Sequence, residues 1–169
     1  SVIAQASAHV ACQMGYDVLY MKTARLTQDL GGGHADGTVK ARLRKYINPD
    51  LLILDDFGLR EFTSQHAEDL YEVICERYRV GSTTVVSNRA PKDWYGLFPN
   101  PVLAEGALDR LINSVHHLLL TGKNYRSLYR PGGPGIADSS VSEQSAALQQ
   151  ILEVVETTLT DESLYKIGG

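Results

Sequence analysis

The feature that most constrains the fold is an uninterrupted apolar run that ends in two acidic residues. Positions 51–54 are all apolar, and Asp55 and Asp56 follow directly. A strand that is apolar on both faces is typical of a parallel sheet covered by helices on both sides. In such a sheet, ligands bind beyond the carboxyl ends of the strands. The run therefore predicts a central strand with two carboxylates at the ligand-binding edge.

Strand and helix patterns alternate around this run. Apolar residues at helical spacing predict helices over residues 2–14, 38–47, 64–78 and 101–113, with a shorter helix starting at residue 91. Apolar and β-branched runs predict strands over residues 17–20, 51–54, 83–87 and 114–120. This alternation implies parallel βαβ units and therefore an α/β fold, a three-layer α/β/α sandwich.

Two segments interrupt the alternation. Residues 24–30 are expected to form one or two helical turns that end at a glycine triplet, residues 31–33, which is either a flexible loop or a helix cap. After Arg130 the composition changes, because residues 131–135 read Pro-Gly-Gly-Pro-Gly and residues 140–160 have the pattern of a polar, acidic helix. We therefore expect a core domain over residues 1–130 and a linker with an acidic tail over residues 131–169.

Composition excludes several classes of protein. The 169 residues are 43% hydrophobic and 21% charged, which is the profile of a soluble globular domain and not of a disordered chain. No apolar run approaches the roughly 20 residues of a membrane span. The two cysteines have neither disulfide-framework nor metal-ligand spacing, so a reducing, cytoplasmic setting is the simplest interpretation.

Charge is distributed unevenly, although the net charge is only −4. Residues 22–45 carry six basic residues against two acids, and residues 131–169 carry six acids against one lysine. A basic stretch can contact nucleic-acid phosphates, and it can equally be a solvated helix surface. This stretch is too short to decide between the two interpretations by itself.

The acid pair is the strongest local indication of chemistry. An acid at the carboxyl edge of a parallel sheet can hold Mg²⁺ through water, because this ion keeps most of its hydration shell. A second acid beside it can orient or deprotonate an attacking water. An apolar strand followed by Asp55 and Asp56 thus has the form of a Walker B motif. The alternative is two solvated acids at the end of a strand.

Three further polar residues can serve the same chemistry. Asn88 follows the strand over residues 83–87 and is expected at the same sheet edge as Asp55, where it can contact a γ-phosphate or simply cap a turn. Arg110 can reach a neighbouring subunit's nucleotide or be an ordinary helix surface charge. Arg126 follows the last predicted strand and can approach the same phosphates or lie on the surface.

Taken in order, these parts resemble the IstB/DnaC family of AAA+ ATPases, which includes ATP-binding helpers of transposition and replicative helicase loaders. The resemblance covers roughly residues 1–130. Its matching pieces are Ser1–Ala6, Ala11–Tyr16, Asp50–Gly58, Ser87–Pro91, Ala107–Leu111 and Asn124–Arg126. The family implies a P-loop NTPase core of the RecA-like AAA+ type, with a first strand and a phosphate-binding loop that would precede Ser1.

The resemblance implies a role for each candidate residue. Ser1 is similar to the last residue of the Walker A Gly-Lys-Ser/Thr, and together with Asp55 it would hold Mg²⁺ beside ATP. The remaining implied roles are the water-activating acid for Asp56, sensor 1 for Asn88, the arginine finger acting in trans for Arg110, and sensor 2 for Arg126. Because the Gly-Lys loop would precede Ser1, this chain by itself is expected to bind ATP poorly.

The family also implies partners. Residues 22–45 resemble a helical insertion that lines a DNA-binding pore, so the DNA-binding candidates are Lys22, Arg25, Lys40, Arg42, Arg44 and Lys45. The implied function is an ATP-hydrolysing helper that assembles on DNA as a homo-oligomer with shared nucleotide sites and assists a transposase. A helicase loader and a non-hydrolysing DNA-binding scaffold remain open alternatives. A metal-dependent phosphohydrolase would need carboxylates at other strand ends, which the sequence does not supply.

Overall fold

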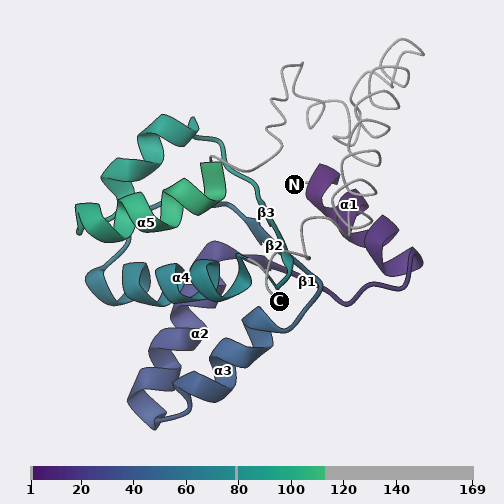
Figure 1. Ribbon diagram of the computed structural model, residues 1–169, viewed down its shortest axis with the longest axis horizontal. Helices are drawn as coiled ribbons and strands as arrows, with labels where there is room; N and C mark the ends of the chain where they lie inside the picture. The colour runs from purple at the N-terminus through teal and green to yellow at the C-terminus, as the bar shows by residue number, and fades with distance from the viewer. Residues whose placement is uncertain (1, 79, 113–169) are drawn as a thin grey trace, which may run out of the picture.

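The computed structural model describes residues 2–78 and 80–112, which form a parallel sheet between two layers of helices (Figure 1). The strands are β1 (Val18–Lys22), β2 (Leu51–Asp55) and β3 (Ser82–Val85). They lie in the order β1-β2-β3, and both neighbouring pairs are parallel. All five residues of β2 are buried, which confirms the predicted central strand.

Five α-helices and one 3₁₀-helix surround the sheet in the described part of the chain. They are α1 (Val2–Gln13), α2 (Thr23–Asp36), α3 (Val39–Ile47), α4 (Ser64–Arg77), η1 (Pro91–Leu97) and α5 (Pro101–Ile112). The start of α4 is capped by Thr63, whose hydroxyl accepts a hydrogen bond from the amide of His66 at 3.3 Å. No helix among the described residues is long and apolar enough to cross a membrane.

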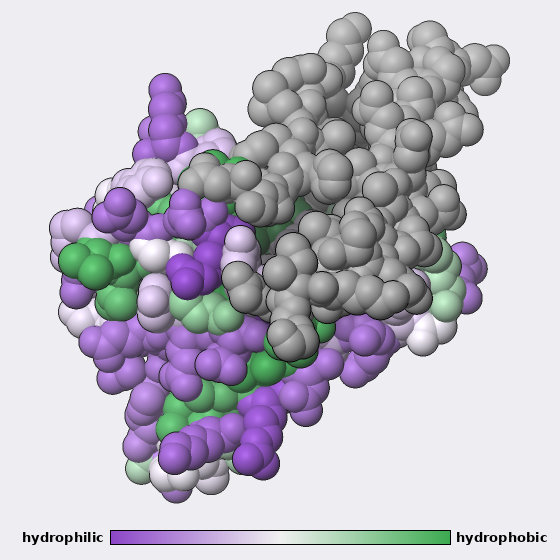
Figure 2. All heavy atoms as spheres, in the orientation of Figure 1, coloured by the Kyte–Doolittle hydropathy of each residue, from purple (hydrophilic) through white to green (hydrophobic). Residues whose placement is uncertain are grey.

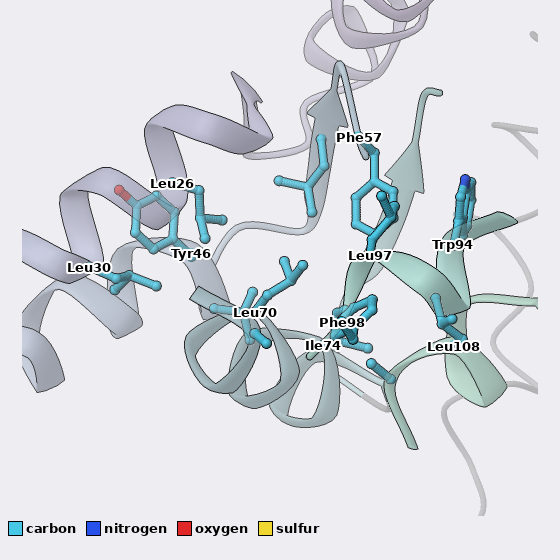
Figure 3. Close-up of a cluster of buried hydrophobic side chains, with 14 of the residues drawn as sticks. Leu26, Leu30, Tyr46, Phe57, Leu70, Ile74, Trp94, Leu97, Phe98 and Leu108 are labelled. Carbon is cyan, nitrogen blue, oxygen red and sulfur yellow. The ribbon is translucent and has the colours of Figure 1, made fainter. Parts of the chain in front are cut away.

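The two faces of the sheet pack against different helices. Leu51 and Ile53 point toward α1, where they form a small cluster with Ala4 and Ala11. The alternate residues of β2 join a larger core with α2, α3, α4, η1 and α5 on the other face (Figures 1 and 3). Because side chains alternate along a strand, Asp55 continues the α1 face. The predicted three-layer α/β/α architecture is therefore confirmed.

The larger core contains an aromatic cluster, of which Figure 3 labels Phe57, Trp94 and Phe98. Phe57, which follows Asp56, is fully buried, and its ring centroid lies 4.8 Å from that of Trp94. The Phe57 amide also donates a hydrogen bond to the carbonyl of Val86, at 2.9 Å. Burial of a side chain of this size stabilises the fold by roughly 1.5–3 kcal/mol. Phe57 therefore anchors the chain where it leaves the acid pair.

The prediction that a helix ends at the glycine triplet of residues 31–33 is wrong. Helix α2 runs through the triplet, and the chain turns at Gly37, whose φ is +75°. A Cβ atom on Gly33 would lie 2.8 Å from the Cα of Val39 in α3. The glycine thus lets α2 and α3 approach closely, and this packing offsets the roughly 1 kcal/mol that glycine costs inside a helix.

The remaining boundaries differ less. The strand expected over residues 83–87 spans 82–85 and is only half-buried, because in the described part of the chain β3 has a neighbouring strand on one side alone. The strand expected over residues 114–120, the domain boundary at residue 130 and the acidic helix over 140–160 lie outside the described residues.

A buried arginine closes the amino-terminal end of the sheet. The Arg77 side chain is 1% exposed and bonds to the end of α3, to the connection that precedes β2 and to the first two residues of β3. Its guanidinium donates to the carbonyl oxygens of Ile47 at 2.7 Å, Pro49 at 2.8 Å and Ser82 at 2.6 Å, and to the Thr83 hydroxyl at 3.0 Å. Because most of these acceptors are backbone oxygens, this residue fixes where both strands begin.

Candidate functional site

Asp55 is a buried carboxylate at the carboxyl end of the central strand. Its side chain is 3% exposed, and both of its oxygens accept hydrogen bonds. The Tyr20 hydroxyl, from β1, donates to Oδ2, and the Asp56 amide donates to Oδ1 at 2.9 Å. The hydroxyl of Thr23, the first residue of α2, donates to the Asp55 carbonyl at 3.1 Å. Donors from three segments thus hold this residue in place.

The hydrogen bonds around Asp55 favour its ionised form. Burial by itself raises the pKa of this carboxyl, but donors that include the Tyr20 hydroxyl and the Asp56 amide outweigh burial and lower the pKa. The same contact, together with burial and the two negative charges, raises the pKa of Tyr20 to about 12. At neutral pH the pair is therefore a carboxylate held by a neutral phenol, and the carboxylate is the form that binds a metal ion.

Asp56 is more open and has an unusual backbone. Its φ is +55°, the only positive value among the described residues other than glycine. Aspartate tolerates this left-handed conformation better than most residues do. The side chain is 41% exposed and pairs with Lys22, whose Nζ lies 2.8 Å from Oδ2. An exposed pair of this kind contributes about 0–1 kcal/mol, so Asp56 remains accessible to a ligand.

Asn88 lies at the same edge of the sheet as Asp55, as its position after β3 predicts. The preceding residue, Ser87, holds the two strand ends together, because its hydroxyl donates to the Phe57 carbonyl at 2.7 Å. Asn88 itself is exposed. Its amide therefore stands in solvent near the acid pair and is available to a ligand there.

Within a single chain, the contacts of Arg110 lie away from the acid pair. Arg110, near the end of α5, donates to the Gly106 carbonyl of its own helix at 2.6 Å, and its guanidinium lies 5.5 Å from the centroid of the Tyr78 ring. None of the contacts found within the described residues joins it to Asp55 or Asp56. Ser1 and Arg126 lie outside the described residues.

The acid pair has the chemistry of a magnesium site that phosphates and water complete. Within residues 2–78 and 80–112, no group of three or more histidine, cysteine, aspartate or glutamate residues could enclose a metal ion. Mg²⁺ does not need such a cage, because it usually keeps several waters and takes one or two carboxylates plus substrate phosphates. Ionised Asp55, with Asp56 beside it, fits this requirement.

A second candidate surface is a groove of about 660 Å³ between β1, α2 and α3. Its basic lining residues are Arg25, Arg42 and Lys45, and we call it the basic groove. The part of the surface over α2 and α3 is mostly hydrophilic, with apolar side chains between (Figure 2). An open groove with basic walls can accept an anionic chain such as a nucleic-acid backbone.

The six DNA-binding candidates divide into two groups. Arg42 donates to Asp29 Oδ1 at 2.7 Å and to Asp36 Oδ2 at 2.6 Å, so its charge is largely balanced within the α2–α3 hairpin. Lys45 lies 3.9 Å from Asp29 Oδ2, and Lys22 pairs with Asp56. The other three candidates, Arg25, Lys40 and Arg44, are exposed and belong to no ion pair among the described residues. We call these three the unpaired basic group, and they present positive charge to solvent.

Sequence reasoning missed the contribution of β1 to the acid pair. Tyr20 was not singled out, and Lys22 was assigned only to DNA binding. The two residues are separated by one position, so they lie on the same face of β1. The register pairs Lys22 with Asp55, which brings both side chains to the acid pair. The two-residue spacing indicates that both side chains share a face of β1, but the register between β1 and β2 is needed to show that this face meets Asp55.

Relatives of this chain are ATP-binding proteins of insertion sequences. One from Mycobacterium tuberculosis is 53% identical over 131 residues, which cover 77% of this chain and 52% of that protein. One from Sinorhizobium fredii is 35% identical over 126 residues, covering 75% of this chain and 51% of that protein. This chain therefore spans about half the length of the curated relatives it matches.

Among solved structures, DnaA from Aquifex aeolicus bound to AMPPCP superposes with a TM-score of 0.53. The match has 20% sequence identity and covers 61% of this chain and 32% of that one. At this identity the likeness shows the α/β fold alone, and it agrees with the layers described above. At the level of sequence, the family model described as IstB-like ATP binding protein matches residues 1–130, and the chain belongs to that family.

Proposed function

We propose that this chain supplies the ATP·Mg²⁺ site of a DNA-associated helper of transposition. The observation that carries the proposal is the buried, hydrogen-bonded carboxylate of Asp55 at the carboxyl end of the central strand, with Asp56 beside it. The insertion-sequence context of the relatives supports this function, and the DnaA-like neighbours do not favour a helicase loader. The expected partner is accordingly a transposase, and the expected setting is the cytoplasm.

In this proposal each residue of the sheet edge has a distinct task. When bound, Mg²⁺ would neutralise charge on the ATP phosphates and help to position them. Asp55 would hold the ion through water, together with the hydroxyl of Ser1. Asp56 would orient the attacking water and accept its proton while the bond between the γ-phosphorus and the bridging oxygen breaks. Asn88 and Arg126 would contact the γ-phosphate.

Arg110 would act on the nucleotide of a neighbouring subunit. A guanidinium can stabilise the negative charge that develops on the transferred phosphoryl group. Within one chain Arg110 is engaged with its own helix and with Tyr78, which agrees with a role that needs a second copy. The proposal therefore includes a homo-oligomer in which each nucleotide site is shared between two subunits.

DNA would bind mainly through the unpaired basic group, Arg25, Lys40 and Arg44. A residue that contacts phosphate contributes about one unit to the slope of log affinity against log salt concentration. We therefore expect Lys40→Ala and Arg44→Ala each to flatten that slope by about one unit. Binding of a labelled duplex at several salt concentrations measures this slope. If the slope is unchanged in both variants, these two residues do not contact DNA phosphates.

The nucleotide site is tested by titration with a fluorescent ATP analogue and Mg²⁺. The proteins are the chain itself, an extended form in which a glycine-rich Gly-Lys loop precedes Ser1, and the extended form with Asp55→Ala. Asp50→Ala is a matched control, because this acid stands at the opposite end of the same strand and accepts a hydrogen bond from the Asp17 amide.

We expect the extended form to bind far more tightly than the chain itself. Asp55→Ala should remove most of the Mg²⁺ dependence of binding, and Asp50→Ala should keep it. If Asp55→Ala and Asp50→Ala behave alike in a folded protein, the acid pair is not the magnesium site. A non-hydrolysing scaffold would then be the better description.

A further inference from the structure

The Tyr20 hydroxyl reaches from the edge strand to the buried acid of its neighbour. The two residues are 35 positions apart in the sequence, and their contact crosses from β1 to β2. The register pairs Tyr20 with Ile53 and Lys22 with Asp55, so the phenol spans one diagonal step of the sheet. A tyrosine side chain is long enough for this step, and its hydroxyl ends at Oδ2 of Asp55.

The two described donors approach different oxygens of the carboxylate. The Tyr20 hydroxyl takes Oδ2 and the Asp56 amide takes Oδ1. Donors on different oxygens of one carboxylate together restrict its rotation, and a carboxylate can accept about four hydrogen bonds in all. The backbone amide comes from the acid's own neighbour and is always present. Of these two donors, the one on a side chain is the Tyr20 hydroxyl, so its contribution can be removed by substitution.

We propose that Tyr20 is a positioning residue for Asp55, which aims the carboxylate at the Mg²⁺-bound water of the nucleotide site. This inference rests on the proposed function. Tyr20 itself would touch neither ATP nor the ion. It would act by stopping rotation about the bond that carries the carboxylate. A hydrogen bond to a charged group is among the stronger ones in proteins, so its loss should have a measurable effect.

The test is a Mg²⁺ titration of the extended form at a fixed concentration of the fluorescent ATP analogue. Tyr20→Phe removes only the hydroxyl and keeps the ring. We expect the Mg²⁺ concentration at half-maximal binding to rise about tenfold, which is the typical scale for losing a hydrogen bond to a charged group. Binding at saturating Mg²⁺ should recover, because the phosphate-binding loop is unchanged.

The chain offers a closely matched control. The Tyr46 hydroxyl also donates to a partly buried aspartate, Asp29, but this contact joins α3 to α2, away from the acid pair. Tyr46→Phe therefore removes the same kind of bond and should leave the Mg²⁺ dependence unchanged. Thermal unfolding of both variants shows whether each is folded and by how much it is weakened.

A second readout needs neither nucleotide nor activity. In the chain labelled with ¹³C at the tyrosine Cζ, the resonance that disappears in Tyr20→Phe belongs to Tyr20. We expect Asp55→Asn to shift this resonance, because an amide oxygen is a weaker acceptor than a carboxylate. The Tyr46 resonance, assigned in the same way, should not move.

The outcomes separate this inference from the function on which it rests. If Asp55→Ala removes the Mg²⁺ dependence while Tyr20→Phe behaves like Tyr46→Phe, Tyr20 is not a positioning residue and the proposed function stands. If Asp55→Ala has no effect, both proposals fail. If the chemical shift of the Tyr20 resonance does not change in Asp55→Asn, the contact is absent, and the inference is overturned whatever the titration gives.

Discussion

The two ends of the sheet each bury one charged side chain and use it differently. Arg77 closes the amino-terminal end, where its guanidinium bonds to backbone carbonyls of the segment that leads into β2 and of the first residue of β3. Asp55 lies at the carboxyl end, where its carboxylate accepts hydrogen bonds from the Tyr20 hydroxyl and the Asp56 amide and stands next to an exposed acid. The charge of Arg77 is satisfied by contacts within the fold, whereas the carboxylate of Asp55 lies beside an acid that a ligand can reach. Burial of a charge by itself therefore does not identify a functional site.

The largest expected effect comes from a substitution at the amino-terminal end of the sheet. Arg77→Met removes the donors on which several buried carbonyls depend, and each buried polar group left without a partner costs about 1–3 kcal/mol. We expect the free energy of unfolding to fall by about 3 kcal/mol or more. Urea denaturation of this variant and of the unchanged chain measures the loss. A change within about 0.5 kcal/mol would mean that the arginine does not hold the strand starts.

A smaller loss of stability is expected from a substitution at the carboxyl end of the sheet. Asp55→Asn keeps the shape of the side chain but supplies one good acceptor where the carboxylate supplied two. We expect a fall of about 1–2 kcal/mol in the free energy of unfolding, less than for Arg77→Met. The same urea experiment measures both. The comparison between the two ends fails if Asp55→Asn is the more destabilising of the two variants.

The Tyr20–Asp55 contact predicts a dependence of stability on pH at both extremes. Tyr20 has a raised pKa, so its contribution is present below the unfolded value of 10.0 and is lost as the pH rises toward about 12. Asp55 has a lowered pKa, so its contribution is present above the unfolded value of 3.8 and is lost as the pH falls through the lower folded value. Thermal melts of the chain and of Tyr20→Phe should approach each other as the pH rises from 10.0 toward about 12 and as it falls below 3.8. Parallel curves throughout would argue against the contact.

The smallest expected effect concerns the ion pair beside Asp55. Lys22 and Asp56 are 61% and 41% exposed, so their attraction is screened by water. We expect Lys22→Ala to change the free energy of unfolding by less than about 1 kcal/mol, and the change should be smaller at high salt than at low salt. Denaturation at low and high salt checks this. A larger loss would show that this ion pair contributes substantially to the stability of the carboxyl end of the sheet.

Hydrophobic pattern was enough to predict β2, its helices and the position of the acid pair, because periodicity reports burial directly. It was wrong at the glycine triplet, since the close approach of Val39 to Gly33 decides that α2 continues, and this contact comes from tertiary packing. Arg77 was not predicted because its partners are backbone carbonyls, which leave no mark in the sequence. Tyr20 was missed for a related reason, namely that its role depends on strand register.

We assign the metal ion of the nucleotide site to Asp55 and Asp56, and locating that ion tests this assignment most directly. In the extended form with ATP, Mn²⁺ can replace Mg²⁺ and broaden nearby resonances. We predict that the ¹³Cζ resonance of Tyr20, whose hydroxyl touches Asp55, broadens much more than that of Tyr46. Asp55→Ala should abolish the difference. Equal broadening of the two resonances, or broadening that survives Asp55→Ala, would place the ion elsewhere and contradict the assignment of the acid pair.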